Sequence, residues 1–203
     1  MSIIKVEHKT DCELLEIGRK IGESFAAEKS GVVTILPKNH IVKTFQIMTE
    51  FYYKLGVLYQ ISENSEGYLA FWRKSQKIPL KLKARVIRRM ILEVPLHSCL
   101  LIAPTGREQF RLIFKHEEDY VAVSMVVVLK EFQGRGFMHH LLEIPFSIAR
   151  KNNIPCVLDT DTELKVKKYM RCGMKISKHT KLKNGFDLYT LEYRAKDHDQ
   201  PFQ

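Results

Sequence analysis

The chain has 203 residues, of which 45% are hydrophobic, so it is long and apolar enough to bury a core without disulfide bonds. Its formal net charge of +10 will attract anionic ligands. No apolar stretch reaches the length of a transmembrane helix, and Lys5, Glu7, His8 and Lys9 stand where a signal peptide would be apolar. These features favour a cytoplasmic protein with no membrane-spanning segment.

The first 119 residues predict mainly helices, with one hairpin among them. A strand is expected over 3–8, and Asp11 as the N-cap begins a helix that runs to about Ala27. The other elements expected here are a helix over 41–55, a hairpin of strands 57–62 and 67–73, and helices over 80–92 and 105–115.

Basic residues gather just after this hairpin. They are Arg73, Lys74, Lys77, Lys81, Lys83, Arg85, Arg88 and Arg89. The apolar residues of the segment recur at helical spacing, at Leu80, Ala84, Ile87, Ile91 and Val94. This pattern predicts an apolar side and a separate, solvated basic face. That face either aids solubility or recruits an anionic partner such as RNA or a membrane surface. Aromatic residues are scarce in this segment, which argues against a stacking surface for single-stranded nucleic acid.

The second half predicts a regular alternation of strands and helices. The Val-rich run 120–129 is typical of a buried central strand. It is followed by a helix over 136–152, a strand over 155–160, a helix over 162–172 that ends at Gly173, strands over 174–182 and 186–193, and a polar tail over 195–203. Asn184-Gly185 between the last two strands is a hairpin signal.

Two glycines separate the central strand from the helix behind it. Gly134 and Gly136 let the backbone bend so that several N–H groups point into one hollow, at the positive end of the helix dipole. Arg135 between them offers a charge-assisted contact, so the loop suits a phosphate. Taken alone, the glycines are more typical of a simple strand-to-helix turn, because neither a third glycine nor a Gly-Lys-Ser/Thr ending follows.

The ordered set of motifs narrows this choice. Gln133-Gly134-Arg135-Gly136-Phe137-Met138 and Tyr169-Met170-Arg171-Cys172-Gly173-Met174 resemble two signatures of the GNAT superfamily of N-acetyltransferases, with Met138 and Met174 as departures. The resemblance implies an α+β fold with a mixed, mostly antiparallel twisted sheet of about six to seven strands and helices on both faces. We expect one domain over 1–194, with an acetyl-CoA core over 120–193 and an acceptor half over 1–119.

The resemblance also implies roles for single residues. The cofactor-binding set is Val126, Val127, Val128, Gln133, Gly134, Arg135, Gly136, Phe137 and Met138. Tyr169 would protonate the departing thiolate as general acid. Asp159 is the candidate general base, with Glu118, Asp119 and a base-free route through ordered water as rivals. Lys165 stands where the family often has an asparagine, which removes one usual contact to the cofactor.

We therefore expect transfer of an acetyl group from acetyl-CoA to a primary amine of a small molecule or a peptide, by direct attack in a ternary complex. The alternatives are a GNAT-fold module that binds acyl-CoA without turnover and, less favoured, a nucleic-acid-binding protein. The sequence leaves open whether the protein forms a homodimer. No metal is expected, because His139 and His140 are adjacent and point in different directions. The cysteines Cys12, Cys99, Cys156 and Cys172 form no Cys-x-x-Cys pair and are expected to be buried structural thiols.

Overall fold

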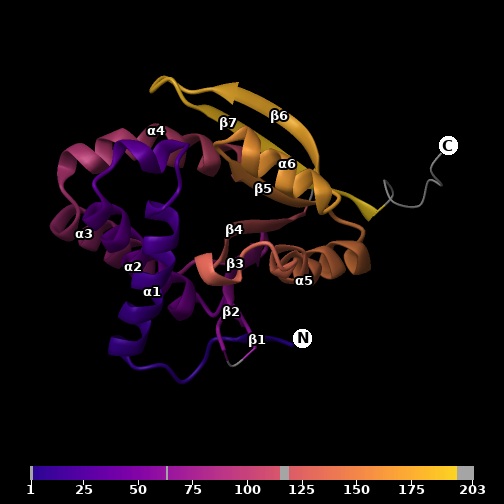
Figure 1. Ribbon diagram of the computed structural model, residues 1–203, viewed down its shortest axis with the longest axis horizontal. Helices are drawn as coiled ribbons and strands as arrows, with labels where there is room; N and C mark the ends of the chain where they lie inside the picture. The colour runs from indigo at the N-terminus through magenta and orange to yellow at the C-terminus, as the bar shows by residue number, and fades with distance from the viewer. Residues whose placement is uncertain (1, 63, 115–118, 196–203) are drawn as a thin grey trace.

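A seven-stranded sheet forms the centre of the molecule, with the strand order β1-β2-β3-β4-β5-β7-β6 (Figure 1). The computed structural model describes residues 2–62, 64–114 and 119–195, and only the backbone of 106–114. The strands are β1 Ile3–Lys5, β2 Leu58–Ile61, β3 Gly67–Arg73, β4 Val121–Val128, β5 Cys156–Thr160, β6 Lys175–Lys181 and β7 Asp187–Tyr193. Of their pairings only β4 with β5 is parallel. The expected mixed, mostly antiparallel sheet is confirmed.

Helices cover both faces of this sheet. On one face, α5 (Phe137–Asn152) and α6 (Glu163–Arg171) bury Leu141, Phe146 and Val166 against β4 and β5. On the other, α1 (Asp11–Ala26) and α2 (Lys38–Leu55) pack on β2, β3 and the end of β4. Because successive residues of a strand point to opposite faces, both cores draw on the same strands.

The helices α1 and α2 pack unusually closely at two glycines. A Cβ added at Gly18 would lie 2.6 Å from the Cα of Gln46, and one added at Gly22 would lie 2.6 Å from the Cα of Val42, so only glycine fits at both positions.

Helix α1 begins with a capping box in which the Thr10 hydroxyl accepts from the Glu13 N–H and the Glu13 carboxylate accepts from the Thr10 N–H. The prediction of Asp11 as N-cap is wrong by one residue. Asp11 lies in the first turn, where its charge suits the helix dipole.

The helices α3 (Leu80–Glu93) and α4 (Leu96–Phe114) follow β3. The predicted start of α4 and the predicted buried side of α3 are both wrong. Helix α4 begins at Leu96 rather than near residue 105: Pro95 precedes its first turn, a position that proline tolerates, and Pro104 lies inside it. The predicted apolar side of α3 is not buried either: Leu80, Ala84, Ile87 and Ile91 are exposed, and only Val94, the C-cap, is buried. The helix packs through Leu82 and Val86 instead.

The hairpin of β6 and β7 has the turn predicted from Asn-Gly. Gly185 has φ +85°, and the Leu182 N–H donates to the Phe186 carbonyl at 2.8 Å.

Cys156 and Cys172 are buried as expected, whereas Cys99 is half-buried and Cys12 is exposed on α1, so the prediction is wrong for Cys12. Across the described ranges, no helix combines the length and apolarity needed to cross a bilayer. Of the predicted tail over 195–203, residues 196–203 lie outside the described residues. The sequence did not predict a short 3₁₀ helix, η1 (Val32–Ile35).

Candidate active site

The parallel strands β4 and β5 separate part of the way along the sheet. They pair from Val121 with Cys156 to Val123 with Leu158. Beyond this, among the strand pairs that the structure describes, β4 pairs only with β3 while β5 pairs with β7. The sheet therefore opens at residues 124–128, where the backbone of β4 has an edge available for an extended ligand.

A β-bulge at Ser124 marks the point of separation. Ala70 pairs with Met125 and Phe71 with Val123, so Ser124 is the extra residue. Its hydroxyl is hydrogen-bonded to the Tyr52 hydroxyl of α2, with 2.8 Å between the oxygens. A bulge bends the strand and changes which face the following side chains point to. Ser124 was not singled out from the sequence, although it is the one polar residue in the Val-rich run.

The glycine loop lies at the carboxyl end of β4. Gly134 and Gly136 have φ of +82° and +81°, and a Cβ added at either would meet nothing within 4 Å. Gly136 is the N-cap of α5 and offers no side chain, so no side chain caps the first N–H groups of the helix. Uncapped N–H groups, open space and the positive end of the helix dipole fit an anion such as a phosphate.

The side chains of the predicted cofactor set point in several directions. Gln133 donates through its side-chain amide to the Val128 carbonyl at 3.0 Å, which ties the loop to the end of β4. Val127 and Phe137 are buried in the two cores, so only their backbone groups are free to face a ligand. Arg135 is exposed, and its guanidinium carbon lies 5.8 Å from the centre of the Phe132 ring.

The remaining members of the set, Val126, Val128 and Met138, are partly buried against the core below α5. Met138 therefore fills space in the hydrophobic core at the first turn of α5. Its side chain is held by packing, and the N–H groups of that turn are the contacts left for an anion.

Tyr169 lies on α6 and is buried in the core beneath α5 and α6. Burial raises the pKa of its hydroxyl far above the ordinary value, and the nearby negative charges of Glu28 and Asp161 raise it further. The hydroxyl therefore stays protonated at neutral pH. Such a group is able to donate a proton but not to act as a base.

An ion cluster lies beside Tyr169. The Lys165 ammonium is 2.6 Å from Glu28 and 3.0 Å from Asp161, and it lies 5.8 Å from the centre of the Phe25 ring. Burial lowers the pKa of Lys165, but the two carboxylates outweigh it, so the pKa is raised. Asp161 also accepts from the Val32 N–H at 2.7 Å. The cluster thus fastens the segment after α1 to the start of α6.

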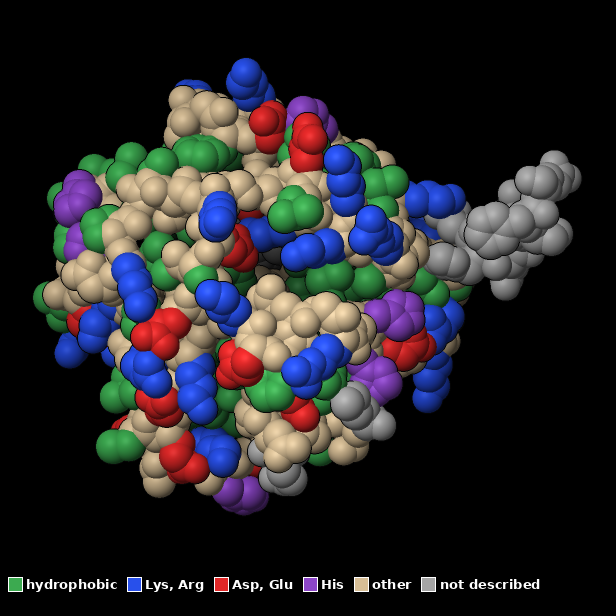
Figure 2. Space-filling model, viewed as in Figure 1, with side chains coloured by type: hydrophobic (Ala, Val, Ile, Leu, Met, Phe, Trp, Pro, Cys, Tyr) green, Lys and Arg blue, Asp and Glu red, His purple; other side chains and the backbone are tan. Residues whose placement is uncertain are grey.

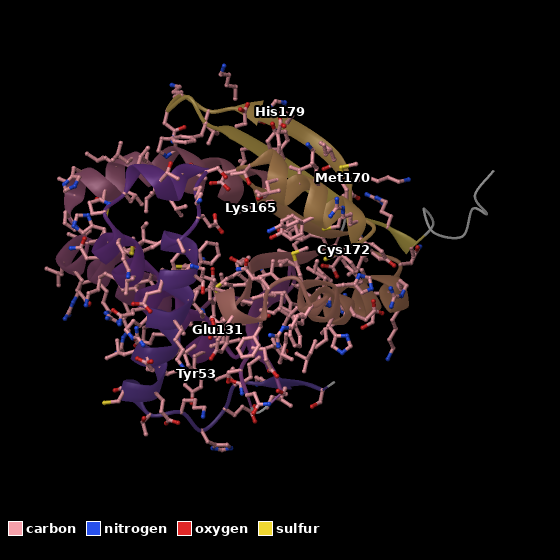
Figure 3. The ribbon with its side chains drawn as sticks, in the orientation of Figure 1. Tyr53, Glu131, Lys165, Met170, Cys172 and His179 are labelled. Atoms are coloured by element: carbon pink, nitrogen blue, oxygen red, sulfur yellow. The ribbon has the colours of Figure 1, made fainter. Side chains whose placement is uncertain are left out.

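This cluster borders an opening in the surface. Figure 2 shows a hollow near the centre of the viewed face, with Lys and Arg and an acidic side chain beside it, and Figure 3, in the same orientation, labels Lys165 in this region. Gly31, with φ +91°, belongs to the same arrangement, because a Cβ there would lie 2.3 Å from an Asp161 oxygen. The sequence marks Lys165 as a departure from the family pattern but does not predict its ion pair with Glu28, which lies far from it along the chain.

Asp159 lies on β5, half-buried, and its carboxylate accepts from the Thr190 hydroxyl at 2.7 Å. Burial raises its pKa to about 6, against the opposing effects of the Thr190 hydrogen bond and the Lys178 charge. Asp159 therefore changes protonation near neutral pH, as a general base must. Thr160 is buried, and Thr162 caps α6 by accepting from the Lys165 N–H.

Asp159 and Tyr169 lie on opposite faces of the sheet. Leu158 belongs to the same core as Tyr169, whereas its neighbour Val157 packs on the other face with Tyr120 and Trp72. Strand alternation places Asp159 on the Val157 side. The two candidate catalytic residues therefore point to opposite faces of the sheet.

The rival bases are weaker candidates. Asp119 accepts from the Arg73 guanidinium at 2.5 Å, and this hydrogen bond lowers the pKa of its carboxyl. It also stands at the start of β4, away from the glycine loop. Glu118 lies outside the described residues. Within the described part of the chain, no three His, Cys, Asp or Glu side chains cluster as a metal site would require.

Comparison with solved structures identifies the architecture. Arylalkylamine N-acetyltransferase 2 from Aedes aegypti superposes with a TM-score of 0.62 at 13% identity, over 95% of this chain and 98% of its own. An N-acetyltransferase from Staphylococcus aureus Mu50 gives 0.58 at 13% identity, over 95% and 100%. The chain has the GNAT fold. The C-terminal condensation domain of Ebony, solved with beta-alanyl-dopamine, shares it with a TM-score of 0.61 at 8% identity, over 96% and 98%.

No family model and no curated protein sequence matches this chain. The likeness is thus one of GNAT-fold architecture at low identity. It covers nearly the whole chain, including the first 119 residues, where the sequence resemblance was weak. The local geometry of the opening and the loop must carry any functional conclusion.

Proposed function

We propose that this protein is an acetyl-CoA-dependent N-acetyltransferase that acts on a primary amine of a small molecule, or of a peptide. The observation that carries the proposal is the opening between β4 and β5 beside an uncapped helix N-terminus. An extended strand edge and a phosphate-binding loop, placed end to end, suit a ligand with an amide-containing arm and a pyrophosphate. Acetyl-CoA has both parts and supplies the thioester acetyl group.

Each part of the opening has a role under this proposal. The backbone of residues 126–128 would pair with the pantetheine arm, and an N–H there would face the thioester carbonyl oxygen as negative charge develops on it. The loop 133–138 would hold the pyrophosphate through N–H groups, with Arg135 adding a positive charge. The net charge of +10 favours the approach of this anionic cosubstrate.

The placement of Asp159 and Tyr169 on opposite faces suits direct transfer. An amine must lose a proton on the side from which it attacks, while the thiolate that leaves must gain one on the far side. Asp159, with a pKa of about 6, would accept the first proton, and Tyr169, protonated throughout the neutral range, would supply the second. The thioester would lie between them, in the opening of the sheet.

The cofactor site is tested by Gly136→Glu, measured as acetyl-CoA affinity by calorimetry. The side chain would place bulk and negative charge at the start of α5, so binding should weaken at least 100-fold. Gly185→Glu is the matched control: Gly185 also has positive φ and open space around it, but it lies in the β6–β7 turn. Unchanged affinity in Gly136→Glu would contradict the site.

Turnover is tested with a panel of amines, polyamines, amino acids and peptides, read as thiol release from acetyl-CoA. Acceptance of any amine supports the transferase, and its chemistry decides between small-molecule and peptide acceptors. Binding of acetyl-CoA with no accepted amine would instead favour a module that binds acyl-CoA without turnover.

A further inference from the structure

Helix α3 has two apolar sides, and only one of them is buried. Leu82 and Val86 pack toward α2 and the core. Leu80, Ile87 and Ile91 are 80%, 60% and 66% exposed, and Ala84 is exposed between them. Spacings of four, seven and eleven residues from Leu80 place these four on one side of the helix, opposite the buried one. They form an outward apolar ridge along α3.

Cations border this ridge. Lys83 lies along one flank, and Lys81 and Arg88 along the other, and all three are exposed. Within the residues that the structure describes, no ion pair involves these three, whereas Arg85 pairs with Glu50 and Arg89 with Glu50 and Glu93. The charges next to the buried side are thus neutralised locally, and those next to the ridge are not.

We propose that α3 docks on an anionic lipid surface, with the ridge of Leu80, Ala84, Ile87 and Ile91 in the interface and Lys81, Lys83 and Arg88 against the headgroups. An apolar stripe flanked by cations is the pattern of a helix that lies in the plane of a bilayer. Lysine and arginine also have long aliphatic stems, which let their charges reach headgroups while the ridge is inserted.

The position of α3 fits a flat partner. Figure 1 shows α3 at one end of the molecule, away from the sheet, and Figure 2 shows hydrophobic side chains interleaved with Lys and Arg along that edge. The apolar exposure continues on α4, where Leu96 and Leu100 are exposed. A bilayer accepts such a protruding ridge without a complementary groove.

Charge disfavours the other occupants. In a symmetric dimer through this ridge, Lys83 and Arg88 would face the same basic surface of a second copy. Helix α3 contains no aromatic side chain on which an RNA base would stack, and an aliphatic ridge offers nothing to a phosphate backbone.

The test is co-sedimentation of the full-length protein with vesicles of phosphatidylserine and phosphatidylcholine, and with vesicles of phosphatidylcholine alone. We expect binding to the mixed vesicles only. Ile87→Asp/Ile91→Asp should weaken it at least 100-fold, since the ridge could no longer enter the interface. Lys83→Gln/Arg88→Gln should weaken it about 30-fold, at about fivefold for each charge removed.

Two matched variants serve as controls, each checked for an unchanged thermal midpoint. Leu164→Asp/Met170→Asp makes the same change at exposed apolar residues of α6, and Lys20→Gln/Lys151→Gln removes the same charge elsewhere. Both should bind like the wild type. No binding to the mixed vesicles, equal binding to neutral vesicles, or equal loss in the controls would each overturn the proposal. A dimer that Ile87→Asp/Ile91→Asp dissociates would overturn it in favour of a second copy of the chain on the ridge.

Discussion

Asp159 and Tyr169 show how burial tunes two side chains in ways that suit different roles. Burial raises the pKa of both groups, because it disfavours the charged form of each. For the carboxyl of Asp159 this brings the pKa to about 6, near neutrality, whereas for the phenol of Tyr169 it moves the pKa further from neutrality. The same physical cause thus lets Asp159 accept a proton near neutral pH and holds Tyr169 in the protonated form that a proton donor needs.

We predict that Asp159→Asn lowers turnover about 100-fold or more, because the amine loses its base. In the wild type, kcat/KM should rise with pH through about 6, as Asp159 ionises. This limb should vanish in the variant. The measurement is the pH dependence of thiol release with an accepted amine, and Asp11→Asn, an exposed aspartate on α1, is the control. A profile of unchanged shape in Asp159→Asn would exclude Asp159 as the base.

The same variant tests the burial of Asp159 without turnover. A folded-state pKa above the ordinary 3.8 means that protonated Asp159 favours folding; that stability is complete below 3.8 and is lost as the pH rises through about 6. An asparagine has no charge to bury and retains an oxygen for Thr190. Asp159→Asn should therefore be more stable than the wild type at pH 7.5, by about 1–3 kcal/mol, and not at pH 3.

We predict that Tyr169→Phe lowers turnover about 100-fold while the acetyl-CoA affinity changes less than about twofold, because only the proton donor is removed. The rates come from thiol release and the affinity from calorimetry. Tyr59→Phe is the control, since Tyr59 packs against the same core but stacks on Phe71 of β3, with 4.9 Å between the ring centres. Equal rates in Tyr169→Phe and the wild type would remove this hydroxyl from the chemistry.

At the scale of elements, the ion cluster joins two segments that lie far apart along the chain. The segment after α1 carries Glu28 and Gly31, and the start of α6 carries Asp161 and Lys165. Lys165 is the shared cation between two carboxylates. Its loss would leave two partly buried negative charges close together and beside Tyr169.

We predict that Lys165→Met lowers the free energy of unfolding by about 2–3 kcal/mol at pH 7, through the uncompensated charges of Glu28 and Asp161. The loss should shrink near pH 4, because burial raises the pKa of Glu28 and more of its carboxyl is then protonated. Chemical denaturation at the two pH values is the measurement. Lys167→Met, an exposed change on the same helix, should cost less than about 0.5 kcal/mol. Equal losses in the two variants would show that the cluster does not stabilise the fold.

Most elements were predictable, and the errors have local causes. Strand β4 and the β6–β7 turn follow from a β-branched run and from Asn-Gly, which act within a few residues. The start of α4 was missed because Pro104 reads as a boundary, although a proline within a packed helix is tolerated at a cost. Helix α3 was predicted with nearly correct ends, but periodicity alone does not tell which of two apolar sides meets the core.

At the scale of the whole molecule, the sheet and the charge distribution act together. The strands β4 and β5 separate toward the end of β4 that leads into the glycine loop, and Lys and Arg side chains lie beside the hollow in the viewed face (Figure 2). The outward face of α3 carries a second group of cations at the edge of the molecule. Part of the positive charge of the chain thus lies beside the hollow and part on α3, the two surfaces for which we propose an anionic cosubstrate and an anionic lipid surface.

The sequence by itself determined the order of the second-half elements, the positive-φ glycines of the loop and the spacing of Tyr169 to Gly173, because these depend on backbone conformation and helical period over short distances. Only the tertiary structure decided where β4 and β5 part, that Lys165 joins Glu28 to Asp161, and which side of α3 is buried. Each of these is a contact, or the lack of one, between segments far apart in the chain, and it depends on packing that no local pattern records.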